Sequence, residues 1–345
     1  MGDFLHTPTR PVEIDGTISI SELLERMGGT AFQGRNLSLA YSIWKRMLSG
    51  RTTIFLGLAG ALVPAGMRKL LVHVIENRWI DCLVSTGANL FHDVHETLGR
   101  YHWQGSSQVD DCQLKKAGID RIYDTFAVEE EFRETDEYIA EFAATLDQDR
   151  PYTTREFLNL LGKNLCIDGS QKGILSSAFE AGVPVYCPAI ADSSIGIAIA
   201  YGRYRGDNSL NFDVVTDILE TAEIVIHSKN TGVIYLGGGT PKNLIQQTEM
   251  TASIMGEDAP GHRYAIQVIT DPPHWGGLSG CTFAEAQSWG KVALDATAVT
   301  VYCDATIALP IIVAALEEHK EGSSDKRVMP RFSMGRSLEF VIRDS

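Results

Sequence analysis

Short apolar runs that each end in a glycine-rich or polar turn recur along the chain. Six of them are rich in β-branched and aromatic residues, which favours strands. They cover residues 52–56, 79–85, 184–187, 233–236, 264–270 and 299–303. Stretches with apolar residues at helical spacing follow or separate them. Strands that alternate with helices in this way predict a mostly parallel sheet that is buried on both faces.

The predicted helices lie before, between and after these strands. They cover residues 18–27, 36–49, 67–78, a stretch from 90 onwards, 132–148, 153–165, 243–250 and 304–319. Ser21 is the candidate cap of the first helix, and Gly57 is expected to end the first strand.

The chain is expected to hold one large α/β domain, because no linker rich in proline, glycine and serine divides it. We place an N-terminal arm and short helix at 1–27, the domain at 28–320 and a tail at 321–345. The tail is polar from Gly322 and ends in a strand or an arm at 332–342.

Composition restricts the class of partner. Of the 345 residues, 44% are hydrophobic, and the net charge of −14 argues against nucleic acid, because no basic stripe could neutralise phosphates. No apolar run predicts a membrane span, and the N-terminus has no signal-peptide core. Six scattered cysteines without a CxxC pair predict a reduced cytoplasmic protein with buried thiols.

The turn Gly237–Gly238–Gly239–Thr240–Pro241 is the strongest phosphate signal. Glycines let a ligand approach the backbone, Thr240 could cap a helix and Pro241 suits its first turn. A pyrophosphate could lie against this helix start. The chain has neither a Walker loop nor a GxGxxG motif, so a simple tight turn is the alternative.

The run EAQSWGKVALDATAVTVYCDA at 285–305 carries two chemical candidates. Lys291 follows Trp289 and Gly290, where partial burial would favour the neutral amine that imine chemistry needs. Asp304 follows a strand, where ribose hydroxyls are held in α/β proteins. The alternatives are a solvated lysine and a helix-capping aspartate.

Three histidines lie close together at 92, 95 and 102. A helix would place His92 and His95 near one face, as in a zinc site, but no HExxH motif or cysteine partner completes one. A polar helix face is the alternative, and we predict no metal.

Several motifs together resemble the deoxyhypusine synthase family, to which homospermidine synthase is closely related. They are TIFLGLAGALVPAG, WIDCLVSTGAN, PVYCPAIADSSIG, TGVIYLGGGTPK, EAQSWGK and VYCDATIALPIIVA, in the family's order across roughly 28–320. The resemblance implies a single large Rossmann-like domain. It also implies a homotetramer with active sites at dimer interfaces.

The resemblance further implies an NAD-dependent transferase. The family moves an aminobutyl group from a polyamine such as spermidine, through an imine on a lysine, to an acceptor amine. Lys291 matches that lysine. The acceptor is a protein lysine in one branch and putrescine in the other. The positions that match the family's NAD contacts are Gly60, Ala61, Pro64, Thr86, Gly87, Ala88, Asp192, Gly238, Thr270, Ser279, Asp304 and Ala305.

The substrate end departs from the family's pattern. Phe91 and His92 replace two glutamates, and Asn243 replaces a histidine. Ile197 and Leu278 each replace an aspartate, and Gly60–Ala61 replaces an Asn-Ser pair. Each lost carboxylate removes a charged partner for an ammonium. The candidate substrate contacts are therefore His92, Asp93, Asn243, Glu285 and Trp289, and the pattern is that of a relative with a different amine donor or acceptor.

Three other functions fit the same residues. The first is a homospermidine synthase-type enzyme with a small amine acceptor. The second is a catalytically silent NAD-binding homologue, against which the retained Lys291 argues. The third is a dehydrogenase that releases its imine to hydrolysis.

Overall fold

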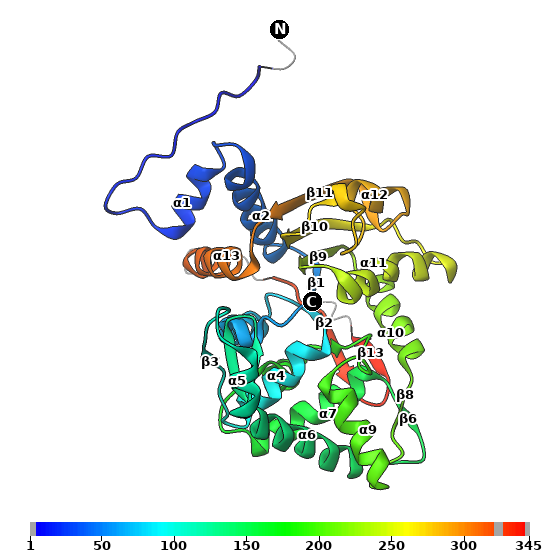
Figure 1. Ribbon diagram of the computed structural model, residues 1–345. Helices are drawn as coiled ribbons and strands as arrows, with labels where there is room; N and C mark the ends of the chain where they lie inside the picture. The colour runs from blue at the N-terminus through cyan, green and yellow to red at the C-terminus, as the bar shows by residue number, and fades with distance from the viewer. Residues whose placement is uncertain (1–4, 321–326, 342–345) are drawn as a thin grey trace.

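A six-stranded sheet, parallel throughout, forms the centre of the molecule (Figure 1). The computed structural model describes residues 5–320 and 327–341. The strands are β1 (Thr53–Leu58), β2 (Cys82–Ser85), β7 (Val185–Tyr186), β9 (Thr231–Leu236), β10 (His262–Ile269) and β11 (Val292–Tyr302). All six predicted strands lie in this sheet, which confirms the α/β fold class.

The strand order is β11-β10-β9-β1-β2-β7. If these six strands are numbered 1 to 6 along the chain, the order is 6-5-4-1-2-3. Read from β7 to β11 it is 3-2-1-4-5-6, the order of the Rossmann fold. The chain leaves β1 toward β2 and β7 on one side and later continues from β9 toward β10 and β11 on the other. The direction therefore reverses between β1 and β9, and ligands bind at such a point, beyond the carboxyl ends of the strands.

Successive residues of the strands belong alternately to two separate hydrophobic cores. Leu56 of β1 and Ile234 of β9 belong to the larger core, whereas Phe55 and Val233 belong to the smaller one. Every residue of β1 and β9 is buried. Because side chains alternate across a strand, this pattern requires cover on both faces. Helices α2 and α13 contact one side of the sheet, and α11 and α12 the other.

The helices agree with most of the predicted stretches. Their bounds are α1 (Ile20–Met27), α2 (Phe32–Leu48), α3 (Arg68–Glu76), α4 (Gly87–Thr97), α5 (Asp111–Lys116), α6 (Glu129–Ala144), α7 (Thr154–Asp168), α8 (Ile174–Ala181), α9 (Ser194–Arg205), α10 (Val214–Ile226), α11 (Gly239–Ile254), α12 (Phe283–Ser288) and α13 (Ala305–Lys320). A π-helical turn, Val63–Met67, precedes α3.

Three local predictions were wrong. Ser19, not Ser21, caps α1 by accepting a hydrogen bond from Glu22 N. Strand β1 continues through Gly57, where an added Cβ would lie 2.9 Å from the Tyr235 ring. That glycine serves close packing and does not end the strand. Helix α11 begins at Gly239 without a side-chain cap, so Thr240 does not cap it.

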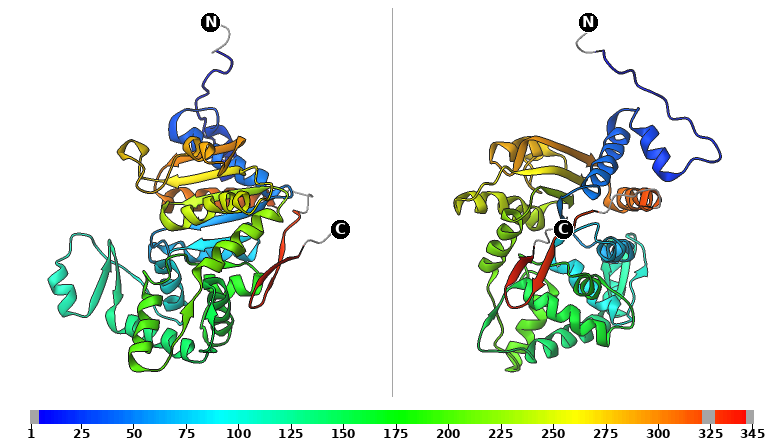
Figure 2. Two further views of the ribbon diagram at one scale, coloured as in Figure 1. Left: turned by 90° about the vertical axis from the view of Figure 1, so that its right-hand side faces the viewer. Right: turned by 180° about the vertical axis from the view of Figure 1, so that it is seen from behind.

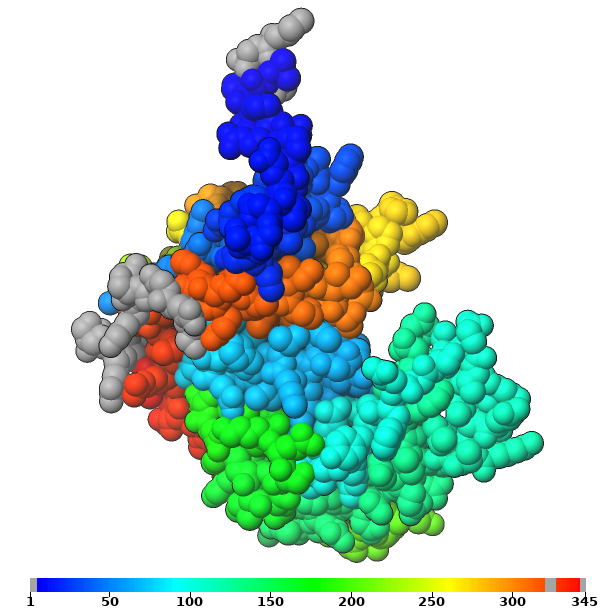
Figure 3. Space-filling model, turned by 90° about the vertical axis from the view of Figure 1, so that its left-hand side faces the viewer, coloured from blue at the N-terminus to red at the C-terminus, as the bar shows by residue number. Residues whose placement is uncertain are grey.

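A small antiparallel sheet, which the sequence pattern did not reveal, projects from the body (Figure 2). It contains β3 (Trp103–Gln104), β4 (Ile119–Ile122) and β5 (Thr125–Val128) in the order β3-β5-β4. In the space-filling view a hollow separates this teal segment from the yellow and orange parts of the chain (Figure 3). A further pair is formed by β6 (Pro151–Tyr152) and β8 (Asn211–Phe212).

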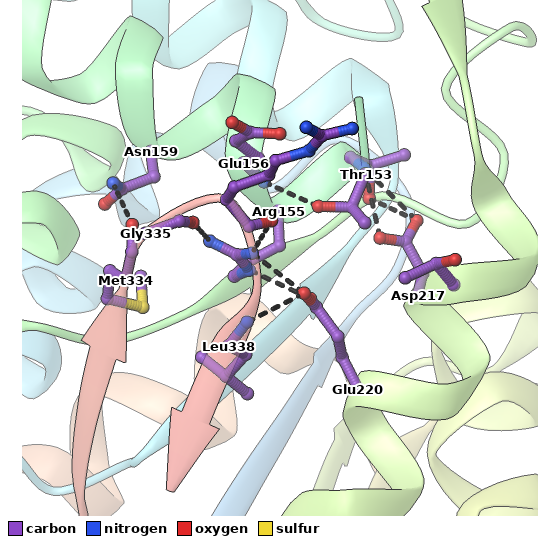
Figure 4. A network of polar contacts seen from close by, with 12 residues as sticks. Thr153, Arg155, Glu156, Asn159, Asp217, Glu220, Met334, Gly335 and Leu338 are labelled. Carbon is purple, nitrogen blue, oxygen red and sulfur yellow. Dashed lines mark hydrogen bonds and ion pairs between the residues drawn. The ribbon is translucent and has the colours of Figure 1, made fainter. Parts of the chain in front are cut away.

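The predicted final strand is an antiparallel hairpin, β12 (Arg331–Met334) and β13 (Leu338–Val341). A buried ion pair fixes it (Figure 4). Arg155 Nη2 lies 2.8 Å from Glu220 Oε1, and Arg155 also donates hydrogen bonds to the carbonyls of Gly335 and Arg336. Glu220 accepts from Leu338 N at 3.0 Å. The tail was predicted to be polar from Gly322, and its residues 322–326 lie outside the described residues.

The N-terminal segment runs extended and away from the body from residue 5 (Figure 1). Glu318 of α13 accepts hydrogen bonds from the backbone N–H groups of Ile20 and Ser21, so the last long helix holds the first one. The division of the chain at residues 27 and 320 stays a prediction.

The cysteines only partly match the predicted buried thiols. Cys82 and Cys187 are buried, but Cys112 and Cys166 are exposed, and all six are free. Across 5–320 and 327–341, no helix is long and apolar enough to cross a bilayer.

Candidate functional site

A cavity of about 1010 Å³ opens at the carboxyl edge of the sheet. Residues after β1, β9, β10 and β11 form one side of it, and the small β3–β5 sheet forms the other. It therefore lies where the chain direction reverses, as expected for a ligand site of this fold. The lining side chains used below are Gly60, Glu96, His102, Trp103, Asp124 and Asp304.

Asn89, a buried residue near the start of α4, shapes the loop that follows β1. Its Oδ1 accepts from Leu62 N at 2.7 Å, and its Nδ2 donates to Gly60 O at 3.0 Å. Thr86 Oγ1 donates to the same carbonyl at 2.7 Å. Gly60 has φ +66° with open space where a Cβ would be, so the cavity side of this turn is bare backbone.

Asp304 has two roles at the far end of this wall. Its Oδ1 accepts from the backbone N–H of Thr306 at 2.7 Å and from the Thr306 hydroxyl, so it caps α13. Its Oδ2 has no protein partner among the described residues. Asp304 is exposed and lines the cavity. Asp304 is therefore a helix-capping aspartate, as the alternative interpretation expected, and its second oxygen leaves room for a ribose contact.

Half of the predicted cofactor residues line the cavity. Those that do are Gly60, Ala61, Pro64, Thr270, Asp304 and Ala305. Those that do not are Thr86, Gly87, Ala88, Asp192, Gly238 and Ser279. Thr86 acts through Gly60, as described above. Gly87 packs so closely that a Cβ would lie 2.2 Å from Ser193 Cβ.

Gly238 has a role that the sequence interpretation did not foresee. An added Cβ would lie 2.0 Å from the carbonyl oxygen of Ser279. The glycine is therefore required for close contact with the 279 loop, and Ser279 O accepts from Gly239 N at 3.0 Å. The Gly-rich turn fixes this loop and does not open toward a phosphate at Gly238.

Among the described residues that line the cavity, the charged side chains are all acidic: Glu96, Asp124 and Asp304. Such a wall favours cations near these carboxylates. An anionic ligand would have to bind at backbone N–H groups. The first turn of the 16-residue helix α13 offers such groups, because Ala305 and Thr306 line the cavity.

The three histidines form one cluster beside the cavity. Glu96 Oε1 lies 2.7 Å from His102 Nδ1, and His102 Nε2 lies 2.9 Å from His92 Nδ1. His95 is buried, and its ring centroid lies 5.2 Å from that of His102. Burial, together with the neighbouring histidines, lowers the pKa of His92 to about 3, and burial lowers the pKa of His95 to about 4.

These two pKa values predict a pH-dependent stability. Both lie below the ordinary histidine pKa of about 6.5, so the unfolded chain binds more protons between about pH 4 and 6.5. The free energy of unfolding should fall as pH drops through that window. The slope of the free energy of unfolding against pH reports the protons taken up on unfolding. In the double variant His92→Gln/His95→Gln this number should be smaller by about two than in wild type. Urea unfolding across this pH range measures the slope, and identical slopes would contradict the assignment.

The alternative zinc site receives no support from this cluster. Within 5–320 and 327–341 no group of three or more His, Cys, Asp or Glu side chains has a geometry that could hold a metal ion. The His92–His102 contact is a direct hydrogen bond.

Asp93 was wrongly considered as an amine contact. It is fully buried, Oδ1 lies 2.9 Å from Arg68 Nε, and its two oxygens accept from Ile174 N and Leu175 N. Asp93 therefore joins α3, α4 and α8 and faces no cavity.

Lys291 lies at the amino-terminal end of β11, whereas the cavity lies at the carboxyl ends of the strands. It precedes the first residue of β11, whereas Asp304 follows the last, and its carbonyl accepts from His262 N. Val292 pairs with His262 and Tyr302 pairs with Ile269, so the two ends of β11 are seven residue steps of β10 apart, roughly 23 Å at about 3.3 Å per step. Lys291 is half-buried, with Nζ 5.4 Å from the centre of the exposed Trp289 ring. One chain therefore does not bring Lys291 to the cavity.

The other candidate substrate residues lie on exposed parts of α11 and α12. Asn243 is exposed in the first turns of α11, and Glu285 is exposed at the start of α12. Lys242, the residue before Asn243 in α11, was not singled out by the sequence. It is buried, and its Nζ donates to Gln267 Oε1 at 3.0 Å and to Cys281 O at 2.6 Å. Desolvation lowers the pKa of Lys242.

Comparisons with known proteins agree on one family. The family model "Deoxyhypusine synthase" matches residues 22–316. "Probable deoxyhypusine synthase 2" of Methanosarcina mazei is 53% identical over 332 residues, covering 96% of this chain and 95% of that one. The protein of the same name from Archaeoglobus fulgidus is 50% identical, covering 84% and 95%.

A solved structure supports the fold. The crystal structure of a "putative deoxyhypusine synthase" from Entamoeba histolytica matches with a TM-score of 0.62 at 18% identity, covering 92% of this chain and 98% of that one. The sequence matches, which span nearly the whole chain, and the shared fold lead to one conclusion. The chain belongs to the deoxyhypusine synthase family.

Proposed function

We propose that the chain is an NAD-dependent transferase that moves an alkylamine unit, such as the aminobutyl group of spermidine, to an acceptor amine through an imine on Lys291. The observation that carries the proposal is the large acidic cavity at the reversal point of a Rossmann-type sheet, in a member of this family. We place the protein in the cytoplasm, in agreement with its free cysteines.

The cavity fits a dinucleotide. Its size is at the upper end of ordinary ligand pockets, the Gly60 turn presents bare backbone, and Asp304 has a carboxylate oxygen to spare. Asp304 would hold a ribose, and the start of α13 would face the pyrophosphate. When bound, the nicotinamide supplies an acceptor and later a donor of hydride.

Lys291 would act as the nucleophile, its neutral amine attacking the oxidised carbon of the donor. Because Lys291 and the cavity lie at opposite edges of one chain, we propose that a second copy completes the site, within a homotetramer. Trp275, Leu278, Trp289 and Leu294, which flank or precede Lys291, are each more than half exposed. Exposed apolar groups of this kind are typical of a covered interface.

In our proposal, the amine donor or the acceptor differs from that of other family members. Methanosarcina mazei has a second relative, "Probable deoxyhypusine synthase 1", to which this chain is 43% identical, against 53% for number 2. Two members in one organism are consistent with separate substrates. Here the acidic cavity favours a polyamine donor, with a small amine or a protein lysine as acceptor.

Product analysis tests this function against its alternatives. The full-length protein is incubated with NAD, spermidine and either putrescine or a lysine-bearing acceptor protein, and products are identified by mass spectrometry. A conjugated amine supports the proposal. Free aminoaldehyde would instead indicate a dehydrogenase, and no product with any di- or triamine would indicate a silent NAD-binding homologue.

Asp304→Asn is expected to weaken NAD binding by about tenfold, since it replaces a charged hydrogen-bond acceptor with a neutral one. The amide oxygen can still accept from Thr306 N, so the cap of α13 is kept. Calorimetric titration with NAD measures the change. Asp258→Asn, at an exposed site after α11, is the control. Equal affinity of Asp304→Asn and wild type would remove Asp304 from the cofactor site.

A further inference from the structure

Glu96 is the acidic side chain that the structure holds most firmly in the cavity wall. It lies near the end of α4 and its side chain is 22% exposed. Oε1 lies 2.7 Å from His102 Nδ1, and Oε2 lies 3.7 Å from Arg68 Nη1. Arg68 is itself fixed by Asp93 and Thr97. The Arg68 guanidinium and the His102 ring therefore orient the carboxylate from the protein side.

Two histidines stand in line behind Glu96. His102 Nδ1 donates to the carboxylate, and His102 Nε2 on the other side of the ring lies 2.9 Å from His92 Nδ1. His102 and His92 are both at least nine-tenths buried, and Phe132 packs against their rings. A buried chain of contacts that ends on a carboxylate fixes its direction.

The surroundings of this chain are charged on several sides. The titratable and charged groups that face it are Arg68 from the start of α3, Asp93 and His95 from α4, Arg100 after α4, Glu131 from α6 and Asp124 from the turn between β4 and β5. Beside His102, Trp103 lines the cavity and is 56% exposed. An exposed indole in the wall of an acidic cavity is a suitable surface for an alkylammonium.

We propose that Glu96 binds the ammonium group of an alkylamine substrate and accepts the proton that this group loses before it is oxidised. In that step an N–H bond of the ammonium breaks, an O–H bond forms on Glu96, and the electron pair stays on nitrogen. His102 and His92 are positioning residues for Glu96. The inference rests on the proposed function and adds to it the substrate class of this end of the cavity and its proton acceptor.

Calorimetry with the NAD-saturated protein tests the binding role. Glu96→Gln should bind spermidine at least about tenfold more weakly than wild type, with NAD affinity unchanged. Wild type should also prefer putrescine over the amino alcohol of the same length, and this preference should shrink in Glu96→Gln. Glu134→Gln, which alters an exposed carboxylate on neighbouring α6 paired with Arg100, should match wild type.

The pH profile of amine oxidation tests the proton role. Glu96→Gln should lose the acid limb of kcat/KM. His102→Leu, which removes the donor that orients Glu96, should lower kcat and change KM little. If Glu96→Gln folds poorly, Glu96→Asp serves instead, and it should bind the amine but oxidise it more slowly. Wild-type amine affinity and pH profile in Glu96→Gln would overturn the inference alone. Failure of wild type to bind any di- or triamine would overturn the proposed function with it.

Discussion

Lys291→Arg should abolish the borohydride-trapped adduct between protein and amine substrate, and transfer should fall by at least about a thousandfold, as when other enzymes lose a covalent nucleophile. Arginine keeps a positive charge near Trp289 but cannot form an imine under these conditions. The wild-type protein is treated with NAD, spermidine and borohydride, and the modified residue is located by peptide mass spectrometry.

Lys242 is the informative rival for that adduct. Desolvation lowers its pKa, so its amine is neutral more often than that of an ordinary lysine, yet it is buried and bonded to Gln267 and Cys281. We expect the adduct on Lys291 because it is half-buried and therefore reachable. Lys229→Ala, at an exposed loop position, is the control for lysine loss. An adduct on Lys242, or one that survives in Lys291→Arg, would contradict the assignment.

Arg155→Leu should destabilise the protein by about 3–5 kcal/mol, the cost of leaving one member of a buried ion pair without its partner. Arg155 is fully buried and Glu220 nearly so, and the variant would leave the Glu220 carboxylate with only Leu338 N and the Tyr186 hydroxyl. The C-terminal hairpin would also lose the donors to Gly335 and Arg336 (Figure 4).

Urea unfolding at neutral pH measures this loss. The matched control is Arg121→Leu, which breaks an Arg–Asp pair of similar geometry with Asp111 on an exposed surface. Its unfolding midpoint should stay that of wild type, because solvent screens such pairs. If Arg155→Leu were as stable as Arg121→Leu, the hairpin would be held by other contacts, such as that between Phe340 and the His227 ring.

The sheet could be predicted because its signal is local. Each strand is a short apolar run followed by a turn, and both faces are buried, so the runs at β1 and β9 are continuous in the sequence. The β3–β5 sheet escaped because its strands have two to four residues and are only partly buried. Such segments lack both length and apolar periodicity.

The site was predictable only in part, for a different reason. In parallel sheets ligands bind beyond the carboxyl ends of the strands. Asp304 and Gly60 each follow a strand, and the cavity is found there. It could not show that Asn89 clamps the β1 loop or that His102 reaches both Glu96 and His92, because these contacts depend on side-chain directions in three dimensions. Spacing along the chain also joined Lys291 to Asp304, although a whole strand separates them.

We propose above all that this protein oxidises an amine with a bound nicotinamide. The most direct test of that oxidation is the absorbance of reduced nicotinamide after the full-length protein with NAD is mixed with a panel of di- and triamines. We predict that at least one amine produces bound NADH, in an amount that approaches one per site, and that Glu96→Gln slows its formation. Tight NAD binding without reduced nicotinamide from any amine would contradict the account.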